Sequence, residues 1–363
     1  MGAHPSAPSG LQRDGARITL DVAVAADPVG ELGAEVAARF GGRLPFLLKV
    51  LAAETALSIQ VHPSRPQAEA GYQAENARGL APGDKTRNYV DDWPKPELLC
   101  ALTPFEALAG MRTTQDAAAL LRALDVPALA PLASSLESAS GPAALSAALA
   151  DVLAWPAESR ADVIAAVAAA CARVASSGGS YAADCAAYAK VAVDHPGDIG
   201  LIAALLLRYT VLAPGQAIYL PAAGLHAYLR GAGIEIMGAS DNVLRAGLTP
   251  KHIDIPELLK VSDPATAVPV IEPTALGDGV TAYETPAPEF RLYRAEVDAL
   301  DVTLPAAGRP RVVLCTEGTG TLHAGTEILK LAKGESGYLS ANDGVVLASG
   351  PATLFIAAPG LAE

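Results

Sequence analysis

Polar side chains alternate with apolar ones along a short stretch early in the chain. Strand spacing would place Ser58, Gln60 and His62 on one face and Ile59 and Val61 on the other. An imidazole and an amide oxygen on the same face could help to bind a metal ion. For this stretch alone, however, a histidine that is hydrogen-bonded within the core is the commoner structure.

Two further segments carry groups that could join such a site. Lys95 and Glu97 stand at strand spacing before the apolar run 98–102, so both could face one cavity, although a surface ion pair is the commoner arrangement. His226 follows a turn that contains proline and glycine, and a lone histidine in that setting is more often structural than a ligand. None of these segments identifies a site by itself.

A denser group of charged residues follows. Glu235, Asp241, Arg245 and Lys251 lie within a short part of the chain and are interspersed with Ile, Met, Val and Leu. A solvated face does not usually mix charged and apolar residues so tightly, so a pocket is as good an interpretation as a surface. In a pocket, the arginine and the lysine would provide positive charge for an anionic ligand.

The overall charge restricts the partners. The 26 Lys and Arg against 39 Asp and Glu give a net charge of −13, which repels nucleic acid and anionic membranes from most of the surface. An anionic small substrate would therefore need a local group of cations, for which the chain offers Lys49, Lys95, Arg245 and Lys251. The four cysteines lie far apart without a CxxC pair, which argues against a disulfide framework or a thiolate metal site.

A mainly β structure must position these residues. The length of 363 residues predicts two or three structural units. Strand-like runs at 16–24, 44–50 and 57–62 are followed by Ala and Leu at helical spacing from about 104 to 190. Strands and turns return from residue 211, and the evenly spaced short strands near the end suit a jelly roll or barrel. No segment resembles a secretory signal or a membrane span, so we expect a cytoplasmic protein.

Several motifs occur in a fixed order along nearly the whole chain. They are Met-Gly-Ala-His-Pro-Ser-Ala-Pro-Ser at 1–9, Leu-Ser-Ile-Gln-Val-His-Pro at 57–63, Lys-Pro-Glu at 95–97, and the block 221–256 with Leu-His-Ala-Tyr-Leu and Ser-Asp-Asn-Val-Leu-Arg. Together they resemble the type I mannose-6-phosphate isomerases, also called phosphomannose isomerases. So many motifs in one order make coincidence implausible.

The resemblance implies a fold of cupin-like jelly-roll barrels with an α-helical insertion. In this organisation the catalytic barrel comprises 1–102 and 199–262, the helical insertion is 103–198, and a second cupin-like domain is 263–363. The resemblance also implies one Zn2+ per chain and the interconversion of mannose 6-phosphate and fructose 6-phosphate. The partner would be a small sugar phosphate, without nucleic acid or membrane, and the protein would be a monomer.

Carried onto this chain, the family's zinc ligands are Gln60, His62, Glu97 and His226. Two imidazoles, one carboxylate and a neutral amide leave residual positive charge and room for a water or sugar oxygen, as a catalytic zinc requires. The glutamine also disfavours a cupin oxygenase with iron, whose site has two histidines and one carboxylate.

Other positions match the family's catalytic and substrate-binding residues. An aldose and a ketose interconvert by moving a proton between C1 and C2 through an enediol. Arg245 falls on a catalytic position and suits an enediolate oxygen better than it suits a base, because an arginine pKa lies above about 12. The proton-handling candidates are Lys95, Asp241 and Lys49, and the substrate-binding candidates are Ser58, Glu235 and Lys251. A lysine base would need a lowered pKa, and the sequence leaves open which group is the base and which cation binds the phosphate.

The chain departs from the family pattern at two places. Pro94 stands where many relatives have a histidine before Lys-Pro-Glu, so another group must take over any role of that histidine. Met1 matches a methionine that lies well inside the chains of relatives, so we expect that at least one barrel strand is missing. These departures give a second hypothesis, a catalytically impaired homologue that still binds zinc and sugar phosphate.

Overall fold

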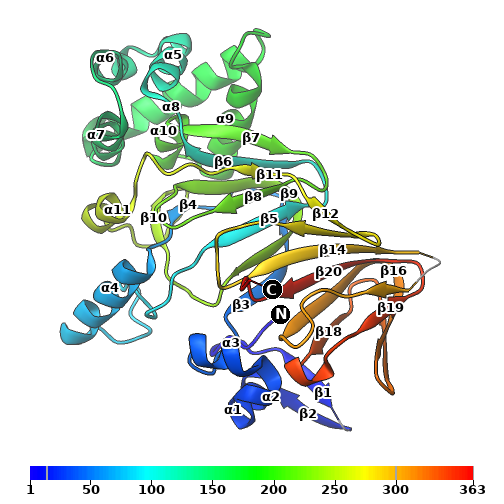
Figure 1. Cartoon of the computed structure of the whole chain (residues 1–363). Helices are drawn as coiled ribbons and strands as arrows, with labels where there is room; N and C mark the ends of the chain where they lie inside the picture. Colours follow the sequence, from blue (N-terminus) through cyan, green and yellow to red (C-terminus); the bar gives the residue numbers. More distant parts are fainter. Residues whose placement is uncertain (14, 299–300, 363) are drawn as a thin grey trace.

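Two nine-stranded sheets form the β structure, and a layer of helices covers one end of it (Figure 1). The computed structural model describes residues 1–13, 15–298 and 301–362. The predicted class, mainly β with inserted helices, is confirmed. Within the described ranges no helix combines the length and the apolar character needed to cross a membrane.

The first sheet is antiparallel and barrel-like, and it carries most of the candidate residues. Its strands are β3 (Phe46–Ala53), β4 (Ile59–Val61), β5 (Glu97–Ala101), β6 (Phe105–Met111), β7 (Leu207–Leu212), β8 (Ala217–Leu220), β9 (His226–Gly238), β10 (Leu244–Gly247) and β11 (Val270–Ile271). The long strand β9 pairs with β3, β4, β5 and β6. Side chains on β5 and β9 are mostly buried, and the buried ones include the polar residues Glu97, His226, Tyr228 and Glu235.

A β-bulge in β9 changes which residues share a face. Glu106 of β6 lies opposite Arg230, but the next residue, Ala107, lies opposite Tyr228, so Leu229 is an extra residue on β9. A bulge of this kind shifts the alternation of the strand by one position. His226 and Tyr228 on one side of the bulge therefore point to the same interior as Glu235 on the other side.

The second sheet makes up the C-terminal part of the chain. Its strands are β12 (Thr274–Gly277), β13 (Val280–Tyr283), β14 (Arg291–Val297), β15 (Val302–Thr303), β16 (Arg311–Ala324), β17 (Glu327–Ala332), β18 (Ser336–Leu339), β19 (Leu347–Ser349) and β20 (Ala352–Ala358), with the 3-10 helix η2 (Ala341–Asp343) between β18 and β19. All the side chains of β20 are buried, between the two neighbouring strands β14 and β16.

Short elements at the N-terminus pack against the sheets. They are the hairpin β1 (Gly10–Arg13) and β2 (Ala16–Thr19), followed by α1 (Leu20–Ala26), α2 (Pro28–Leu32) and α3 (Ala34–Arg39). The prediction of a single strand over 16–24 is wrong for its second half. Leu20 and Val24 lie one helical turn apart and are both buried, and Asp21 stands in the first turn, where an acidic side chain favours a helix.

Helices between β6 and β7 form the layer at the top of Figure 1. They are α5 (Thr114–Leu124), η1 (Pro127–Leu129), α6 (Ala130–Ser138), α7 (Pro142–Leu153), α8 (Ala157–Ala175), α9 (Ala182–Asp194) and α10 (Gly200–Leu205), while α4 (Arg65–Ala77) and α11 (Ile255–Val261) lie elsewhere beside the first sheet. The range 103–198, predicted as the insertion, also contains β6, which pairs with β7 and β9. The range predicted as the insertion therefore includes one strand of the first sheet ahead of its helices.

Residues of both sheets meet in one of the buried hydrophobic clusters. Leu98 and Ile236 of the first sheet belong to the same buried cluster as Phe290, Leu292 and Phe355 of the second part of the chain. A polar link crosses the same boundary, because the Tyr283 hydroxyl donates to the Gly215 carbonyl at 2.9 Å. The C-terminal sheet thus completes the burial of the first sheet.

Candidate active site

Three side chains that can bind a metal converge inside the first sheet. His62 directly follows β4, Glu97 begins β5 and His226 begins β9. Glu97 Oε1 lies 3.3 Å from Nε2 of His62, and Glu97 Oε2 lies 3.5 Å from Nε2 of His226. All three are buried, and their candidate ligand atoms lie within 4.8 Å of one another. The geometry matches three of the four predicted ligands.

Hydrogen bonds leave one nitrogen of each imidazole free for a ligand. Nδ1 of His62 donates to the Asn242 carbonyl at 2.8 Å, and Nδ1 of His226 donates to the Gly224 carbonyl at 3.0 Å. The two Nε2 atoms and Oε2 of Glu97 are buried without a hydrogen-bond partner. Buried polar atoms are rarely left unpaired, and metal-bound histidines commonly donate their other nitrogen to a carbonyl. The site therefore fits a metal ion bound by nitrogen and carboxylate ligands, such as zinc.

Gln60 lies beside this cluster by strand register. It stands opposite His226 on β9 and opposite Arg245 on β10, because β4 pairs with both strands. Directly opposite residues in an antiparallel pair have side chains on the same face. The register brings Gln60 and Arg245 to the face of His226, which is the arrangement required of a fourth ligand and a nearby cation. Ser58 immediately precedes β4 and is partly buried.

Charge and burial set the protonation states of the cluster. Burial would raise the pKa of Glu97, but Lys95 at 3.0 Å and the neighbouring His62 hold that pKa well below its usual range. Burial lowers the pKa of His62 to about 4. The carboxylate is thus ionised and the imidazole neutral near pH 7, the states in which both bind metal.

Lys49 and Glu235 form a second ion pair within the sheet. They lie opposite each other on β3 and β9, with Lys49 Nζ 2.9 Å from Glu235 Oε2. Burial would lower the pKa of Lys49, but the charge of Glu235 outweighs it and the pKa is raised. Burial and the charge of Glu97 raise the pKa of Glu235. Because its pKa is raised, Lys49 stays protonated, which favours a role as a cation rather than as a base.

Tyr228 is a site residue that the sequence analysis did not single out. Its hydroxyl is buried without a hydrogen-bond partner, and burial, Glu235 and Glu97 raise its pKa well above the usual value. Its ring packs edge-on against Phe105, with 5.5 Å between centroids. Strand alternation from His226 would have indicated Tyr228, because the two residues lie two positions apart on β9.

The loop before β10 carries Asp241 to the rim of the site. Asn242 donates to the carbonyls of Asp91 and Trp93 at 2.8 and 2.9 Å, and the Asp241 backbone N–H donates to the Asp91 carboxylate at 2.9 Å. The Asp241 side chain is half exposed, and its Oδ2 lies 3.0 Å from Nε2 of His4. Two loops that are distant in sequence are thus fixed to each other beside His62, the ligand held by Asn242.

Arg245 and Lys251 line a basic cleft of about 420 Å³, together with Lys85, Arg87 and His252. The Arg87 guanidinium is occupied by the carbonyls of Tyr89 and Leu80 and by Asn76. Among the described residues, the side chains of Lys85, Arg245 and Lys251 have no ion pair or hydrogen bond. Burial lowers the pKa of Arg245. Unpaired cations in a cleft favour an anionic ligand.

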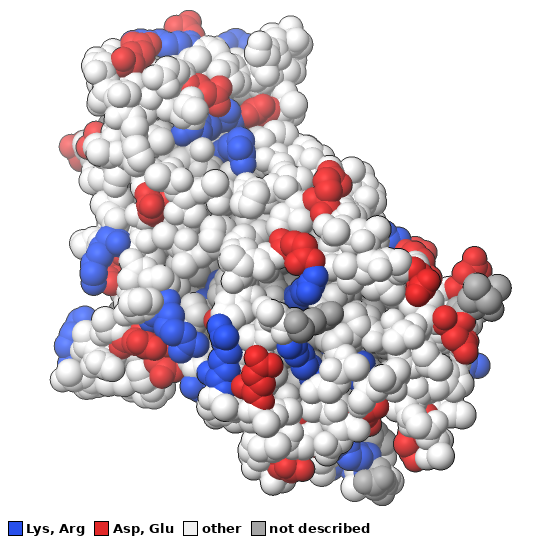
Figure 2. Space-filling view, in the orientation of Figure 1, with Lys and Arg blue, Asp and Glu red and all other residues white. Residues whose placement is uncertain are grey.

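The cleft is a local exception to the charge of the surface. Figure 2 shows one face on which basic and acidic side chains are interspersed and much of the surface is uncharged. The lysines and arginines on this face stand among acidic residues, in contrast to the basic lining of the cleft.

Comparisons with known proteins decide the family. A model described as "Phosphomannose isomerase type I, catalytic domain" matches residues 1–114. The mannose-6-phosphate isomerase of Escherichia coli K12 is 35% identical over 355 residues, which cover 96% of this chain and 88% of that protein. The mannose-6-phosphate isomerase of Rattus norvegicus is 33% identical over 380 residues, which cover 96% and 84%. The chain belongs to the type I phosphomannose isomerase family.

Solved structures of the phosphomannose isomerase family have the same fold. A crystal structure of a point variant from Salmonella typhimurium matches with a TM-score of 0.91 and 34% identity, and covers 99% of this chain and 90% of that one. A zinc-bound structure of mannose 6-phosphate isomerase matches with a TM-score of 0.89 and 34% identity over the same shares. The resemblance stated from the sequence motifs is confirmed.

Proposed function

We propose that this protein is a zinc-dependent isomerase that interconverts D-mannose 6-phosphate and D-fructose 6-phosphate. The observation that carries the proposal is the buried cluster of His62, Glu97 and His226, whose free ligand atoms converge beside unpaired cations. Relatives named mannose-6-phosphate isomerase support the reaction, and a zinc-bound relative supports the metal.

Four residues would hold the metal, with Gln60 joining the cluster. When bound, zinc would act as a Lewis acid that polarises an oxygen of the sugar. Lys95 at 3.0 Å from Glu97 keeps the carboxylate ionised. The carbonyls of Asn242 and Gly224 hold both imidazoles in one tautomer and one orientation.

The reaction requires a proton to leave one carbon and reach its neighbour. Burial and the charge of Glu97 raise the pKa of Glu235, which suits a carboxyl group that takes up and releases a proton, whereas Lys49 beside it is held as a cation. Arg245 would stabilise the negative oxygen of the enediolate, because it stands opposite Gln60 and keeps its positive charge. Asp241 remains a candidate for proton transfer at the sugar hydroxyls.

The basic cleft is the proposed phosphate site. Lys251, Arg245 and Lys85 line it without competing carboxylate contacts among the described residues. Arg245 connects the cleft with the metal ligands through its register with Gln60. A sugar phosphate could thus place its phosphate in the cleft and its reacting carbons near the cluster. Ser58, just before β4, is the proposed polar contact between the two regions.

The assay is the conversion of mannose 6-phosphate to fructose 6-phosphate by the full chain. We expect turnover that disappears on chelation and returns when zinc is added. Turnover that stays absent in zinc-loaded, folded protein would contradict the proposal. The alternative of an impaired binding homologue is not favoured, because the relatives that match nearly the whole chain are named mannose-6-phosphate isomerase.

We also propose that the protein works as a cytoplasmic monomer. Its four cysteines are free and buried, as suits a reducing compartment. A net charge of −13 opposes self-association and keeps nucleic acid away. Light scattering of the zinc-loaded protein should give the mass of one chain, 36.8 kDa. A mass of two chains would contradict the monomer.

A further inference from the structure

His4 pairs with Asp241 in one defined tautomer. The backbone N–H of Ser6 lies 3.2 Å from Nδ1 of His4, and an N–H group can only donate, so Nδ1 is the acceptor. Nε2 therefore carries the proton, and it points to Oδ2 of Asp241 at 3.0 Å. The neutral imidazole thus donates to the carboxylate and occupies one of its two oxygens.

The segment that carries His4 is fixed next to β3. The Met1 ammonium donates to the Leu48 carbonyl at 2.6 Å, and the Leu48 N–H donates to the Met1 carbonyl at 2.9 Å. Gly2 has a φ of +146°, and a Cβ there would lie only 2.7 Å from Leu47 Cδ2. Such close packing leaves the segment little freedom, so the position of His4 is set by the same strand that carries Lys49.

Asp241 stands in a loop whose neighbouring residues belong to the proposed site. The next residue, Asn242, accepts the hydrogen bond that orients His62, and Arg245 follows three positions later. The charge of Asp241 also contributes to the raised pKa of Lys49. The Asp241 side chain is half exposed, so its second oxygen is open to a ligand.

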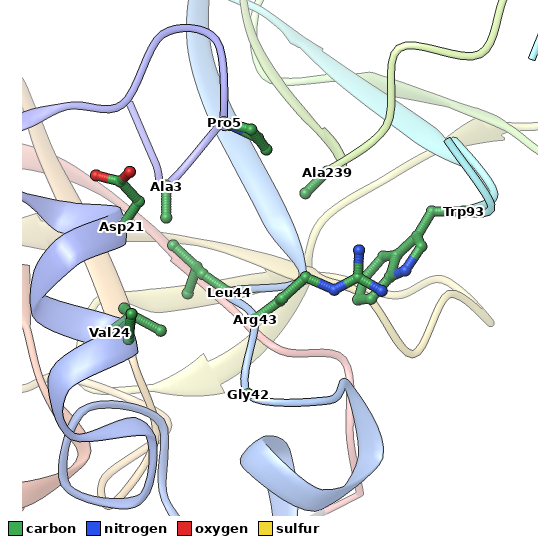
Figure 3. A pocket seen from close by; sticks show the side chains of 10 residues that line it. Ala3, Pro5, Asp21, Val24, Gly42, Arg43, Leu44, Trp93 and Ala239 are labelled. Atoms are coloured by element: carbon green, nitrogen blue, oxygen red, sulfur yellow. The ribbon is translucent and has the colours of Figure 1, made fainter. Parts of the chain in front are cut away.

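The residues before and after His4 line a pocket. Figure 3 shows that Pro5 points toward Ala239 and Ala3 toward Leu44, and that these residues and Trp93 line a pocket of about 320 Å³. Pro94, which follows this tryptophan, is buried and has no group that could donate or accept a proton. The imidazole that contacts Asp241 is carried by the N-terminal segment.

The other five histidines, all within the described ranges, have different surroundings. His62 and His226 belong to the metal cluster. His195 bonds the Ala56 carbonyl at 2.7 Å, and His323 lies 2.9 Å from the Ser349 hydroxyl. His252 lines the basic cleft. Outside the cluster, His4 is the one histidine with a carboxylate partner.

We propose that His4 is a positioning residue that holds the Asp241 carboxylate for proton exchange with a hydroxyl of the sugar. Its Nε2–H occupies Oδ2, which leaves Oδ1 to accept the proton of the hydroxyl on C2 and to deliver it to the oxygen on C1, so that Asp241 is again a carboxylate at the end of the turnover. The proton that moves between C2 and C1 is carried by another group, and the imidazole of His4 keeps its own proton throughout. This inference rests on the proposed isomerase function.

The test compares kcat and KM of zinc-loaded His4→Ala, His4→Gln, Asp241→Asn and the double variant His4→Ala with Asp241→Asn. A hydrogen bond to a charged group predicts a fall in kcat of about 10-fold to 100-fold for His4→Ala, with little change in KM. The amide of glutamine can donate where Nε2–H does, so His4→Gln should restore kcat to within about fivefold. In the Asp241→Asn background, His4→Ala should cause no further loss.

The kinetic results separate failure of the proposed function from failure of the proposed role of His4. An inactive wild-type chain would contradict the proposed function, whereas an active wild type with an equally active His4→Ala variant would overturn only the role of His4. Independent, additive losses in the double variant would also overturn it. If His4→Gln folds and binds zinc but is as slow as His4→Ala, the ring itself transfers the proton and positioning is wrong. His323→Gln, in the second sheet, is the control and should match the wild type.

Discussion

Backbone carbonyls decide which ring nitrogen of each cluster histidine faces the interior. His62 and His226 each donate Nδ1–H to a carbonyl and present a bare Nε2 beside Glu97. Without a metal ion, both Nε2 atoms and Oε2 of Glu97 would be buried without a hydrogen-bond partner, although Lys95 pairs with Oε1. The cluster therefore fits a set of metal ligands.

Substitution of a ligand tests this reading at the residue scale. Glu97→Gln keeps the volume but removes the negative charge, so zinc affinity should fall about a hundredfold or more, and activity with it. Metal analysis of purified protein and calorimetric titration with zinc measure the change. The matched control is Glu289→Gln, a buried glutamate outside the site, which should bind zinc like the wild type. Full zinc occupancy in Glu97→Gln would refute the ligand role.

The phosphate site makes a second prediction at this scale. Lys251→Ala removes a cation from the cleft, so KM for mannose 6-phosphate should rise about 10-fold while kcat changes little. Lys190→Ala, an exposed lysine paired with Glu106, is the control and should leave KM unchanged. Steady-state kinetics and inhibition by inorganic phosphate report the effect. An unchanged KM and phosphate inhibition constant would place the phosphate elsewhere.

At the scale of elements, one buried arginine fastens the helical layer to the first sheet. Arg112 follows β6 and contacts Asp116 of α5 at 2.6 Å, Asp184 of α9, and the Tyr188 hydroxyl at 3.0 Å. The Arg112 side chain thereby forms ion pairs with acidic residues on two helices. The sheet and the insertion are held in one orientation by this contact and by the apolar cluster around it.

Loss of this contact should destabilise the protein. Arg112→Met removes a buried guanidinium that pairs with the partly exposed Asp116 and Asp184 and donates to the Tyr188 hydroxyl, so the free energy of unfolding should fall by about 2 kcal/mol in urea titrations. Arg122→Met removes an exposed pair with Glu137 on the surface of the same layer and should have a much smaller effect. Equal effects of the two substitutions would show that the Arg112 contacts do not hold the layer.

Across the whole molecule, the two sheets depend on one core. Phe355 of β20 is 1% exposed and belongs to the cluster that contains Leu98 and Ile236 of the first sheet. A cavity in this cluster should weaken both sheets at once. Activity, although located in the first sheet, should therefore be sensitive to the C-terminal part of the chain.

Phe355→Ala tests that dependence. The free energy of unfolding should fall by about 4 kcal/mol, and loss of activity and of secondary structure should follow one common transition on heating. Val193→Ala, at a side chain that is 79% exposed, is the control and should have almost no effect. Two separate transitions in Phe355→Ala would contradict a shared core.

Local patterns in the sequence determined several features of this protein. Strand alternation placed Gln60 and His62 on one face, and the helical spacing of Ala and Leu located the insertion, because both periods depend only on neighbouring residues. The family motifs added the candidate ligands and cations. Local patterns failed over 20–24, where the burial of one helical face against the sheets overrode a strand-like run.

Tertiary structure alone decided which of these residues meet. Strand register pairs Lys49 with Glu235 and brings His226 opposite Gln60, and a bulge in β9 turns Tyr228 to the same interior. The pairing of His4 with Asp241 likewise joins opposite parts of the chain. No local period encodes the register between distant strands, and no sequence position reveals the burial that shifts a pKa. The sequence therefore indicated the chemistry, and the fold determined which of the candidate side chains lie together.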